Sequence, residues 1–338
     1  MLTPLPFDTV TQPWLRAAAR AASWFEQHLH DGRLPAGLHD LGSYYKWPLA
    51  LASLGRTELA VRVFDVVVAD FGTEDGDFRT GEAKSADPIY GRIADTYTNT
   101  WPLIAARVLD RQDVGRRGLD CLRRRRVQRT GGFLTGRPGQ HEDERQDIVT
   151  IAGCGNALLA WGHADEATAA GDCLLRVLAA QGGPGEPFHL YIDGEGRPLR
   201  GDLGIESRLA RIDPRLPGQA YVYWGMATVF LARLHLVTGQ ERFLAGARDY
   251  FARHDACDPA HVYAGIGCCK TGWSAATLFR LTGAEAYAEA VHRAAGEISG
   301  LQQEDGGWAL PVSPILACDC VGEMAYHLTH YVLELSGR

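Results

Sequence analysis

The sequence predicts an all-α protein in which six helical hairpins form two concentric rings. Three observations support this prediction. A helical stretch, a turn and a second helical stretch recur along the 338 residues. The first helix of each repeat carries almost no charge, whereas the second carries arginine and glutamate, as expected for an inner helix covered by an amphipathic outer one. No alternation of strands and helices competes with this pattern.

The hairpin is clearest in four segments, and a fifth copy is weaker. In the clear copies a glycine at position 55, 162, 239 or 283 is placed to end the first helix in a left-handed conformation. Polar residues suited to a helix start follow at Thr57, Asp165, Glu241 and Glu285. In the weaker copy, Asp110 and Arg111 occupy the turn. The clear segments are 49–64, 158–175, 231–251 and 278–295, and the weaker one is 102–122.

Glycine-rich connectors join each outer helix to the next inner helix. They include residues 75–78, 131–133 and 304–308 and a much longer segment at about 180–220. We expect a single domain over residues 1–338, with the short turns on one face and the connectors around the mouth of a central cavity on the other. The inner helices are expected to begin near Tyr45, Tyr97, Thr150, Tyr223, Lys270 and Val321.

At this point the chain resembles the (α/α)6 toroid superfamilies. The resemblance rests on repeats such as VTGQERFLAGARDYF (237–251) and QQEDGGW (302–308) and covers nearly the whole chain. These superfamilies include terpenoid cyclases and protein prenyltransferases, linalool dehydratase-isomerase and, more distantly, the six-hairpin glycosidases with N-acylglucosamine 2-epimerase. The resemblance implies an (α/α)6 barrel and does not specify a reaction.

Composition and motifs exclude several classes of partner. A net charge of −7 and a pI of about 5.9 disfavour nucleic acid. No apolar run approaches a membrane span, and residues 1–14 do not resemble a secretory signal, so we expect a cytoplasmic protein. The eight cysteines are expected to be reduced. No nucleotide-binding glycine motif occurs, and we expect no cofactor.

The predicted starts of the inner helices are polar and aromatic, which favours an active site at the mouth of the ring. Unpaired backbone N–H groups make such ends hospitable to anions, and burying polar groups without partners costs free energy. The competing interpretation is helix capping. The six starts are SYYKWP (43–48), DTYTNTW (95–101), DIVTIAGCGN (147–156), YVYWG (221–225), CCKTGW (268–273) and CDCVGE (318–323).

Carboxylates at these starts are candidates for acid/base catalysis. Two carboxylates in unlike environments can divide the roles of acid and base. We prefer the pair Asp95 and Asp147, with Asp40 as a further catalytic candidate. Asp319 and Glu323 are assigned to substrate binding. Aspartate is also among the commonest N-cap residues, so capping remains an alternative for each of the aspartates.

Lysines and cysteines at the same starts are further candidates. The chain has only three lysines, and two of them, Lys46 and Lys270, fall in this ring. They could hold an anion, or Lys270 could act as a base. Cys154 or Cys269 could act as a thiolate favoured by a helix N-terminus, although a buried inert thiol is the simpler alternative.

A weak alternative is a zinc site. The chain is somewhat similar to the lanthionine-forming cyclase toroid, whose zinc ligands come from consecutive inner helices. That similarity would imply Cys269, Cys320 and His327 as ligands here. The match is incomplete, because this chain has CDC where that family has Cys-His followed by Gly.

Aromatic residues of the six starts would line the cavity. They suit a polyene, a developing cation or the apolar face of a sugar, and core packing explains some of them equally well. Tyr45 is also a catalytic candidate. The long connector adds candidates at His189, Tyr191, Glu206 and Arg208. The aromatic set is Tyr44, Tyr45, Tyr97, Tyr221, Tyr223, Trp47, Trp101, Trp224 and Trp273.

These patterns predict an enzyme that acts on a small molecule in the central cavity. We favour a lyase, isomerase or cyclase that uses acid/base chemistry on an apolar, terpenoid-like or polyketide-like compound. The DDxxD and DxDD motifs of terpene cyclases are absent, which disfavours an ordinary prenyl-diphosphate or squalene cyclase. The alternatives are a six-hairpin glycosidase or sugar epimerase and a non-catalytic binding protein. A sugar requires many convergent hydrogen bonds, whereas a terpenoid requires few.

Overall fold

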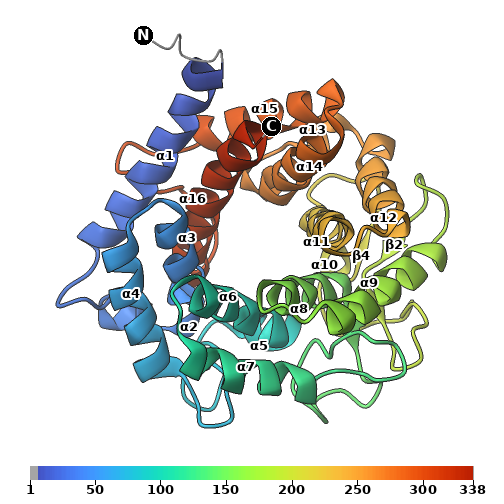
Figure 1. The fold of residues 1–338 in the computed structure, drawn as a ribbon, viewed down its shortest axis with the longest axis horizontal. Coiled ribbons are helices and arrows are strands. Elements are labelled where there is room, and N and C mark those ends of the chain that lie inside the picture. The colour runs from blue at the N-terminus through green and yellow to red at the C-terminus, as the bar shows by residue number, and fades with distance from the viewer. Residues whose placement is uncertain (1–6, 338) are drawn as a thin grey trace.

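The computed structural model describes residues 7–337 and confirms the (α/α)6 toroid (Figure 1). Six helices surround the middle of the molecule, and each is buried along most of its length because neighbours cover it on all sides. This inner ring consists of α3 (Trp47–Ser53), α6 (Asp95–Val108), α8 (Ile148–Ala160), α11 (Val222–Thr238), α14 (Cys269–Thr282) and α16 (Pro314–Ser336).

The outer ring packs around these helices with one face buried and one exposed. Such helices alternate charged and apolar residues with the helical period, so burial of their apolar face holds them on the inner ring. Its members are α1 (Phe7–Gln27), α4 (Thr57–Val66), α7 (Gln112–Arg124), α9 (Ala164–Ala179), α12 (Glu241–Ala252) and α15 (Glu285–Gly300).

The ring is closed by helices from opposite ends of the sequence. Helix α1 lies along α16, and its Phe25 stacks on Trp47 of α3 at a ring separation of 4.0 Å (Figure 1). The outer partner of α16 is therefore α1, whereas each of the other five outer helices follows its inner helix in the sequence. The start predicted near Val321 is wrong, because α16 begins at Pro314, capped by the Ser313 hydroxyl. The other five inner helices begin within two residues of the predicted positions.

The short turns between inner and outer helices follow the predicted glycine chemistry. Gly239 and Gly283 end α11 and α14 in the left-handed conformation, with φ of 68° and 70°. In the weaker repeat Asp110 takes this role, with φ of 55°. Aspartate tolerates this conformation better than most residues, so the fifth hairpin closes without glycine.

The connectors carry short elements on the opposite face. Residues of the long connector form two small antiparallel sheets, in which Asp147 pairs with Tyr191 and Phe188 with Ile212. The connector helices are α2 (Leu41–Tyr44), α5 (Pro88–Ile93), α10 (Ser207–Ala210) and α13 (Pro259–Val262). The strands are β1 (Gln146–Asp147), β2 (Phe188–His189), β3 (Tyr191–Ile192) and β4 (Arg211–Ile212). Single turns of other helix types span Ala36–Leu38, Val67–Phe71, Arg253–Ala256 and Ile266–Cys268.

No helix within residues 7–337 combines the length and apolar character of a transmembrane segment. Residues 1–6, part of the segment that does not resemble a secretory signal, lie outside the described residues.

Candidate active site

Two buried lysines meet two carboxylates at the inner side of the ring. Lys46, just before α3, places its Nζ 2.8 Å from Asp319 Oδ1 and 2.9 Å from Glu323 Oε2. Lys270, the second residue of α14, pairs with the other carboxylate oxygen of Glu323. All four residues are less than one-tenth exposed. The lysines thus hold anionic groups, as one interpretation of the sequence expected, and these groups belong to the chain itself.

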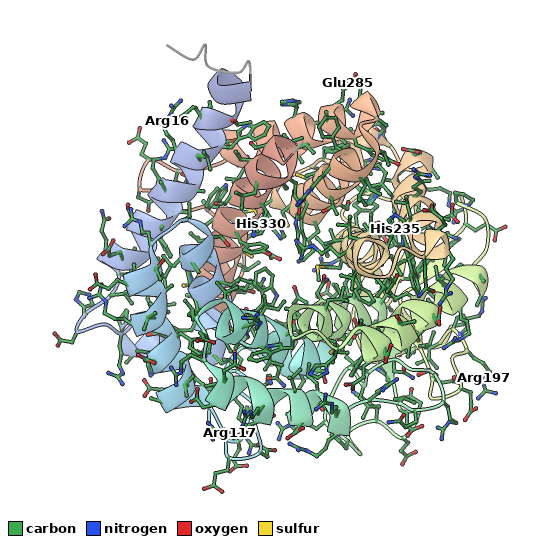
Figure 2. All side chains as sticks on the ribbon, viewed as in Figure 1. Arg16, Arg117, Arg197, His235, Glu285 and His330 are labelled. Atoms are coloured by element: carbon green, nitrogen blue, oxygen red, sulfur yellow. The ribbon has the colours of Figure 1, made fainter. Side chains whose placement is uncertain are left out.

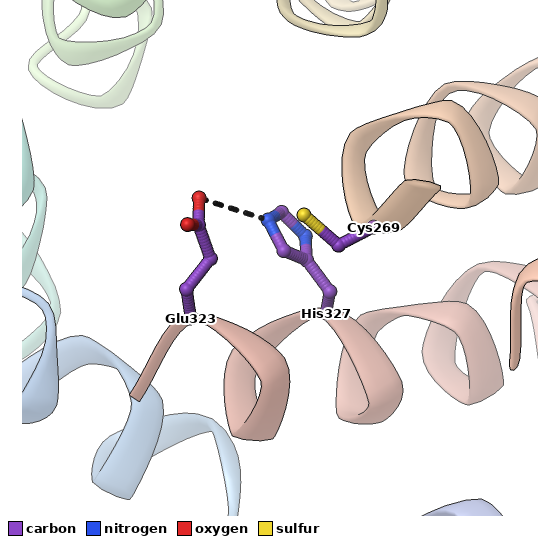
Figure 3. A group of neighbouring side chains, drawn as sticks. All are labelled: Cys269, Glu323 and His327. Atoms are coloured by element: carbon purple, nitrogen blue, oxygen red, sulfur yellow. Dashed lines mark ion pairs between the residues drawn. The ribbon is translucent and has the colours of Figure 1, made fainter. Parts of the chain in front are cut away.

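Helix α16 brings the acidic groups and a histidine onto one face. Asp319, Glu323 and His327 are spaced four residues apart, so their side chains follow one another along the helix. Glu323 and His327 point toward Cys269 on α14 (Figure 3). His327 Nε2 lies 3.6 Å from Glu323 Oε1. We call Lys46, Lys270, Asp319, Glu323 and His327 the central cluster.

The imidazole of His327 retains unused hydrogen-bonding capacity. It is completely buried, and neither ring nitrogen has a hydrogen-bond partner among the described residues. Trp273 packs beside it with ring centroids 5.0 Å apart, and the indole N–H of Trp273 also lacks a partner. Buried polar atoms are normally hydrogen-bonded. These exceptions therefore mark a place where a ligand could supply the missing bonds.

Burial and pairing push the pKa values of the cluster apart. Burial alone would raise the pKa of Glu323, but Lys270 and Lys46 outweigh it and hold that pKa well below its usual range. Burial raises the pKa of Asp319; Lys46 opposes the increase and Glu323 adds to it. Burial lowers the pKa of His327 to about 4, so its imidazole is neutral near pH 7. Carboxyl groups with diverging pKa values suit an acid and an ionised stabiliser.

The lysines of the cluster stay charged. Burial alone would lower the pKa of Lys46, but Asp319 and Glu323 reverse this and hold it well above the ordinary value. Burial also acts to lower the pKa of Lys270, and Glu323 again reverses the direction. Lys270 is therefore an ammonium ion, which argues against its predicted role as a base. A charged pair of this kind can stabilise negative charge that develops on a substrate.

Aromatic side chains surround the cluster. The hydroxyl groups of Tyr45 and Tyr90 both donate to Asp319 Oδ2, at 3.2 and 2.9 Å. Lys46 Nζ lies 5.1 Å from the ring centre of Tyr45 and 5.5 Å from that of Trp101, distances typical of cation–π contacts. Trp101 also donates its indole N–H to the Tyr97 hydroxyl at 2.9 Å. Tyr45, Tyr97, Trp101 and Trp273 thus lie together, as the sequence suggested.

Four predicted aromatic ligands lie elsewhere. Tyr44 accepts the backbone N–H of Leu34 at 2.5 Å and packs against Phe71, and Trp47 stacks on Phe25 of the outer helix α1. Tyr221 donates to the Leu216 carbonyl at 3.0 Å, and Trp224 packs against Phe188 and His254. These contacts are with connector and outer-ring residues, so core packing accounts for Tyr44, Trp47, Tyr221 and Trp224.

Tyr223 belongs near the cluster and meets the long connector. Its phenol interacts with that of Tyr191 on β3, and the charge of Lys270 acts on it. Gly225, two residues further along α11, allows α11 to pack closely on α14, because a Cβ there would lie 2.4 Å from the Lys270 carbonyl oxygen. The long connector thus contributes one of its four candidate residues, Tyr191, beside the centre.

The three aspartates predicted to be catalytic have structural partners. Asp40 caps α2 through the Gly42 N–H at 2.8 Å and accepts from Ser85 and Ala86. Asp95 pairs with Arg125 at 2.6 Å and with Arg137 at 3.5 Å. Asp147 caps α8 through the Thr150 N–H at 2.8 Å and accepts from Thr135 at 2.8 Å. The contacts of Asp40 and Asp147 match the capping alternative, whereas Asp95 is held by ion pairs with two arginines. A catalytic role for each of these residues stays a prediction.

Burial favours the neutral thiol at the two candidate cysteines. Cys154 lies in the second turn of α8, where burial raises the pKa of its thiol well above the ordinary value. Cys269 opens α14, yet burial raises its pKa to about 12. A helix N-terminus therefore does not offset desolvation at either position. Both positions agree with the alternative of a buried thiol, and a catalytic role for either cysteine stays a prediction.

The possible metal ligands in the structure differ from the zinc ligands suggested by the sequence. Cys269 Sγ, a Glu323 oxygen and a His327 nitrogen lie within 4.8 Å of one another, whereas Cys320 is not part of this group. Three protein ligands would suffice for a catalytic zinc. However, Glu323 is already paired with two ammonium groups, and their positive charge opposes a cation at the same place. These residues therefore fit a divalent metal poorly.

Three side chains of the site are not among the residues predicted from the sequence. Tyr90 comes from the connector helix α5, and Tyr326 and His330 extend the aromatic face of α16, with ring centroids 4.0 Å apart. Figure 2 shows His330 at the inner side of the ring. The spacing of Glu323, Tyr326 and His330 places them on one face of a helix, and this spacing could have indicated Tyr326 and His330 from the sequence. Tyr90 had no such signal, because only the folded connector brings it to α16.

Comparison with known proteins gives similarity of fold. No protein-family model matches the chain, and no curated protein does. A D-mannose isomerase structure superposes with a TM-score of 0.69 at 12% identity over 99% of both chains. A cellobiose 2-epimerase from Spirochaeta thermophila gives 0.66 at 15% identity, covering 99% of this chain and 98% of the other. A type II terpene cyclase from Scytonema gives 0.59 at 11% identity over 98% and 100%.

Proposed function

We propose that this protein is an enzyme that transfers protons on a small hydroxylated carbonyl compound such as a sugar, as an isomerase or epimerase. The observation that carries the proposal is the neutral, unpartnered imidazole of His327 next to Glu323, a carboxylate that two lysines hold ionised. A base beside fixed positive charge is what proton abstraction next to a carbonyl group requires.

The residues divide the reaction as follows. The free nitrogen of His327 removes the proton from the carbon next to the carbonyl, so the C–H bond breaks and its electron pair moves toward the carbonyl oxygen. Lys46 and Lys270 stabilise the resulting oxyanion. Asp319, whose pKa burial raises, donates a proton to the substrate oxygen. In an isomerisation, His327 then gives its proton to the former carbonyl carbon, while the neighbouring hydroxyl group of the enediol returns a proton to Asp319 and becomes the new carbonyl. In an epimerisation, the intermediate turns its other face to His327 and receives the proton at the original carbon, while the enol hydroxyl returns its proton to Asp319 and the original carbonyl re-forms.

The polarity of the centre supports a sugar over a terpenoid. Besides the central cluster, Tyr45, Tyr97 and Tyr223 place phenol groups near its charges. A hydroxylated substrate can form further hydrogen bonds with these groups, whereas an apolar one would cover the charges of the cluster and form none. Proteins with this fold that are described as a D-mannose isomerase and a cellobiose 2-epimerase are consistent with the proposal.

A second candidate is the acid-initiated cyclase or lyase favoured by the sequence. Asp319 has a raised pKa, and its partners Tyr45 and Tyr90, together with Trp101, present aromatic rings around it. A protonated carboxyl group near aromatic faces could protonate an alkene or a hydroxyl group and stabilise the cation that follows. A toroid described as a terpene cyclase is among the similar structures.

Isotope exchange tests the proposal directly. Purified protein is incubated with aldoses, ketoses and reducing disaccharides in D2O, and proton NMR follows loss of the signal at the carbon next to the carbonyl. Exchange together with a new isomer supports the proposal. Stabilisation against heat by terpenoid alcohols, without sugar exchange, would favour the second candidate. Binding of sugars without exchange would indicate a binding protein instead.

A further inference from the structure

The connector helix α5 separates the central cluster from a depression on the outside of the molecule. The depression has a volume of about 590 Å³, and Pro88 and Gly91 of α5 form part of its wall. The rest of its lining includes Lys84, Asp95 and Arg137. Its residues come from the connectors before and after α6, on the side where the inner helices begin.

The other side of α5 faces the cluster. Residues 88 and 91 lie one turn apart on a helix, so residue 90 points away from them. Tyr90 is 2% exposed, donates its hydroxyl to Asp319 Oδ2 at 2.9 Å and packs edge-on against Tyr45 at 5.9 Å. A single turn of helix therefore has the depression on one side and the cluster on the other.

The fit of Tyr90 is tight, although α5 itself has few anchors. A Cβ on Gly42 would lie 2.7 Å from Cε2 of Tyr90, so the ring occupies space that only glycine leaves free. Helix α5 spans six residues, is capped by Asp87 and is tied to Ser313 through the same carboxylate. A segment of this length with few bonds is the kind that opens locally while the rest of a protein stays folded.

We infer that the depression is the entrance to the central cluster and that Tyr90 closes it by its hydrogen bond to Asp319. Each side chain of the cluster is less than one-tenth exposed, so a substrate needs a movement to reach it. Opening of α5 would uncover Asp319 first, and its freed oxygen would accept a hydroxyl group of the entering molecule. The inference rests on the proposed function only in taking the cluster as the destination.

Cys320 offers a readout of this movement that needs no substrate. It directly follows Asp319, and it is the only one of the eight cysteines that is not buried. Tyr90 donates to the carboxylate of the preceding residue, Asp319, at 2.9 Å, so Cys320 is next in the chain to the group that Tyr90 contacts. The rate at which N-ethylmaleimide modifies Cys320, followed by mass spectrometry of the peptide that contains it, should increase when α5 opens more often.

Two variants should raise this rate for different reasons. Tyr90→Phe removes the hydroxyl and keeps the ring, and Gly42→Ala pushes the ring out of place. We expect labelling about two- to tenfold faster, the range set by one hydrogen bond. Tyr44→Phe is the matched control, because that buried tyrosine of the neighbouring α2 bonds Leu34, and its labelling rate should equal that of the wild type.

The outcomes separate the entrance from the chemistry. Unchanged labelling in both test variants would overturn the inference, and so would equal acceleration in Tyr44→Phe, which would indicate general loosening. Faster labelling in Tyr90→Phe alone or in both test variants would support it. If labelling is faster but no sugar proton exchanges, the entrance is supported and the proposed function is contradicted. If sugar protons exchange but labelling is unchanged, the proposed function is supported and the entrance is contradicted.

Discussion

Two buried ion networks in this molecule contain the same residue types, but one holds connectors together and the other forms the candidate active site. In the connector network, Asp77 pairs with Lys84 at 2.7 Å and with Arg125 at 2.8 Å, and Arg125 reaches Asp95 at 2.6 Å. The central cluster instead joins α3, α14 and α16 across the inner ring. Each network contains buried lysine, and together they account for all three lysines of the chain.

The difference lies in what remains unbonded. Both oxygens of Asp77 and of Asp95 are paired with cations, and Lys84 also donates to the Asn99 side chain at 2.7 Å. In the central cluster both nitrogens of His327 lack hydrogen-bond partners. Saturated networks hold segments together, whereas an unsatisfied group keeps capacity for a ligand. Burial and charge alone thus fail to distinguish a site from a structural anchor.

The largest effect is expected from His327→Gln, which removes the proposed base. Turnover should fall about a hundred- to ten-thousand-fold, the usual contribution of a positioned base, with a modest change in the free energy of unfolding. Steady-state kinetics and urea unfolding would measure the two. His254→Gln is the control, because His254 is equally buried with a pKa of about 4 but contacts Thr271. An equal loss of turnover in both variants would contradict the role.

The second-largest effect is expected from Lys84→Met, which disrupts the connector network. Lys84→Met leaves Asp77 without one of its two cations, and an uncompensated buried charge typically costs about 3–5 kcal/mol in the free energy of unfolding. Turnover per folded molecule should stay at the wild-type level. Urea unfolding, with activity assayed well below the transition, would check both. A loss of turnover at full folding would mean that the two networks are functionally coupled.

Acid should weaken the two regions in different pH ranges. Burial lowers the pKa of His327 and His254 to about 4 from an ordinary 6.5, so below pH 6.5 the unfolded state binds more protons. Stability should fall by about 1.4 kcal/mol per pH unit for each histidine from there to about pH 4. His327→Gln should reduce this slope. The slope is obtained from the free energy of unfolding at several pH values. Equal slopes in the wild type and in His327→Gln would mean that His327 is not buried in its neutral form.

The connector network should respond at lower pH. Burial raises the pKa of Asp77, but Lys84 and Arg125 outweigh it and bring that pKa to about 2, below the ordinary 3.8. The stabilisation that the Asp77 carboxylate provides is therefore complete above pH 3.8, and it is lost as the pH falls from 3.8 to about 2. Asp77→Asn should remove this part of the acid dependence in the same unfolding series. A steeper acid loss in the variant would contradict the assignment.

The smallest effect is expected from Asp147→Asn. Asparagine is as good an N-cap as aspartate, so the free energy of unfolding should change by less than about 1 kcal/mol and turnover by less than about threefold. Both would be measured beside His327→Gln. A fall in turnover of a hundredfold or more would restore Asp147 to the catalytic role that the sequence suggested.

The repeats predicted the rings because a helical period is a local property of the sequence. The pairing of α1 with α16 was not local, since nearly the whole chain separates them. Lys46 and Lys270 were noticed because lysine is scarce. Asp95 and Asp147 stood out because an aspartate at a helix start looks the same in the sequence whether it pairs with arginine, caps the helix or acts as an acid.

Helix α16 carries the main error in the predicted site. It begins at Pro314, so Asp319 and Glu323 lie in its second and third turns and not at its start. An assumed start near Val321 made these residues part of the rim. His327 then fell two turns below the rim, and it was considered only as a zinc ligand. Only the observed extent of α16 shows that Asp319, Glu323 and His327 lie on one face of the same helix.

The partnership of α1 with α16 also affects how the protein can fold. Helix α1 is synthesised before the five helical pairs that follow it, whereas its packing partner α16 is synthesised after them. Until then its apolar face, with Trp14 and Phe25, remains uncovered, and the five intervening helical pairs form an open arc. Closure of so large a loop raises the contact order and slows folding. Nascent chains of this protein are therefore exposed to aggregation until α16 is complete.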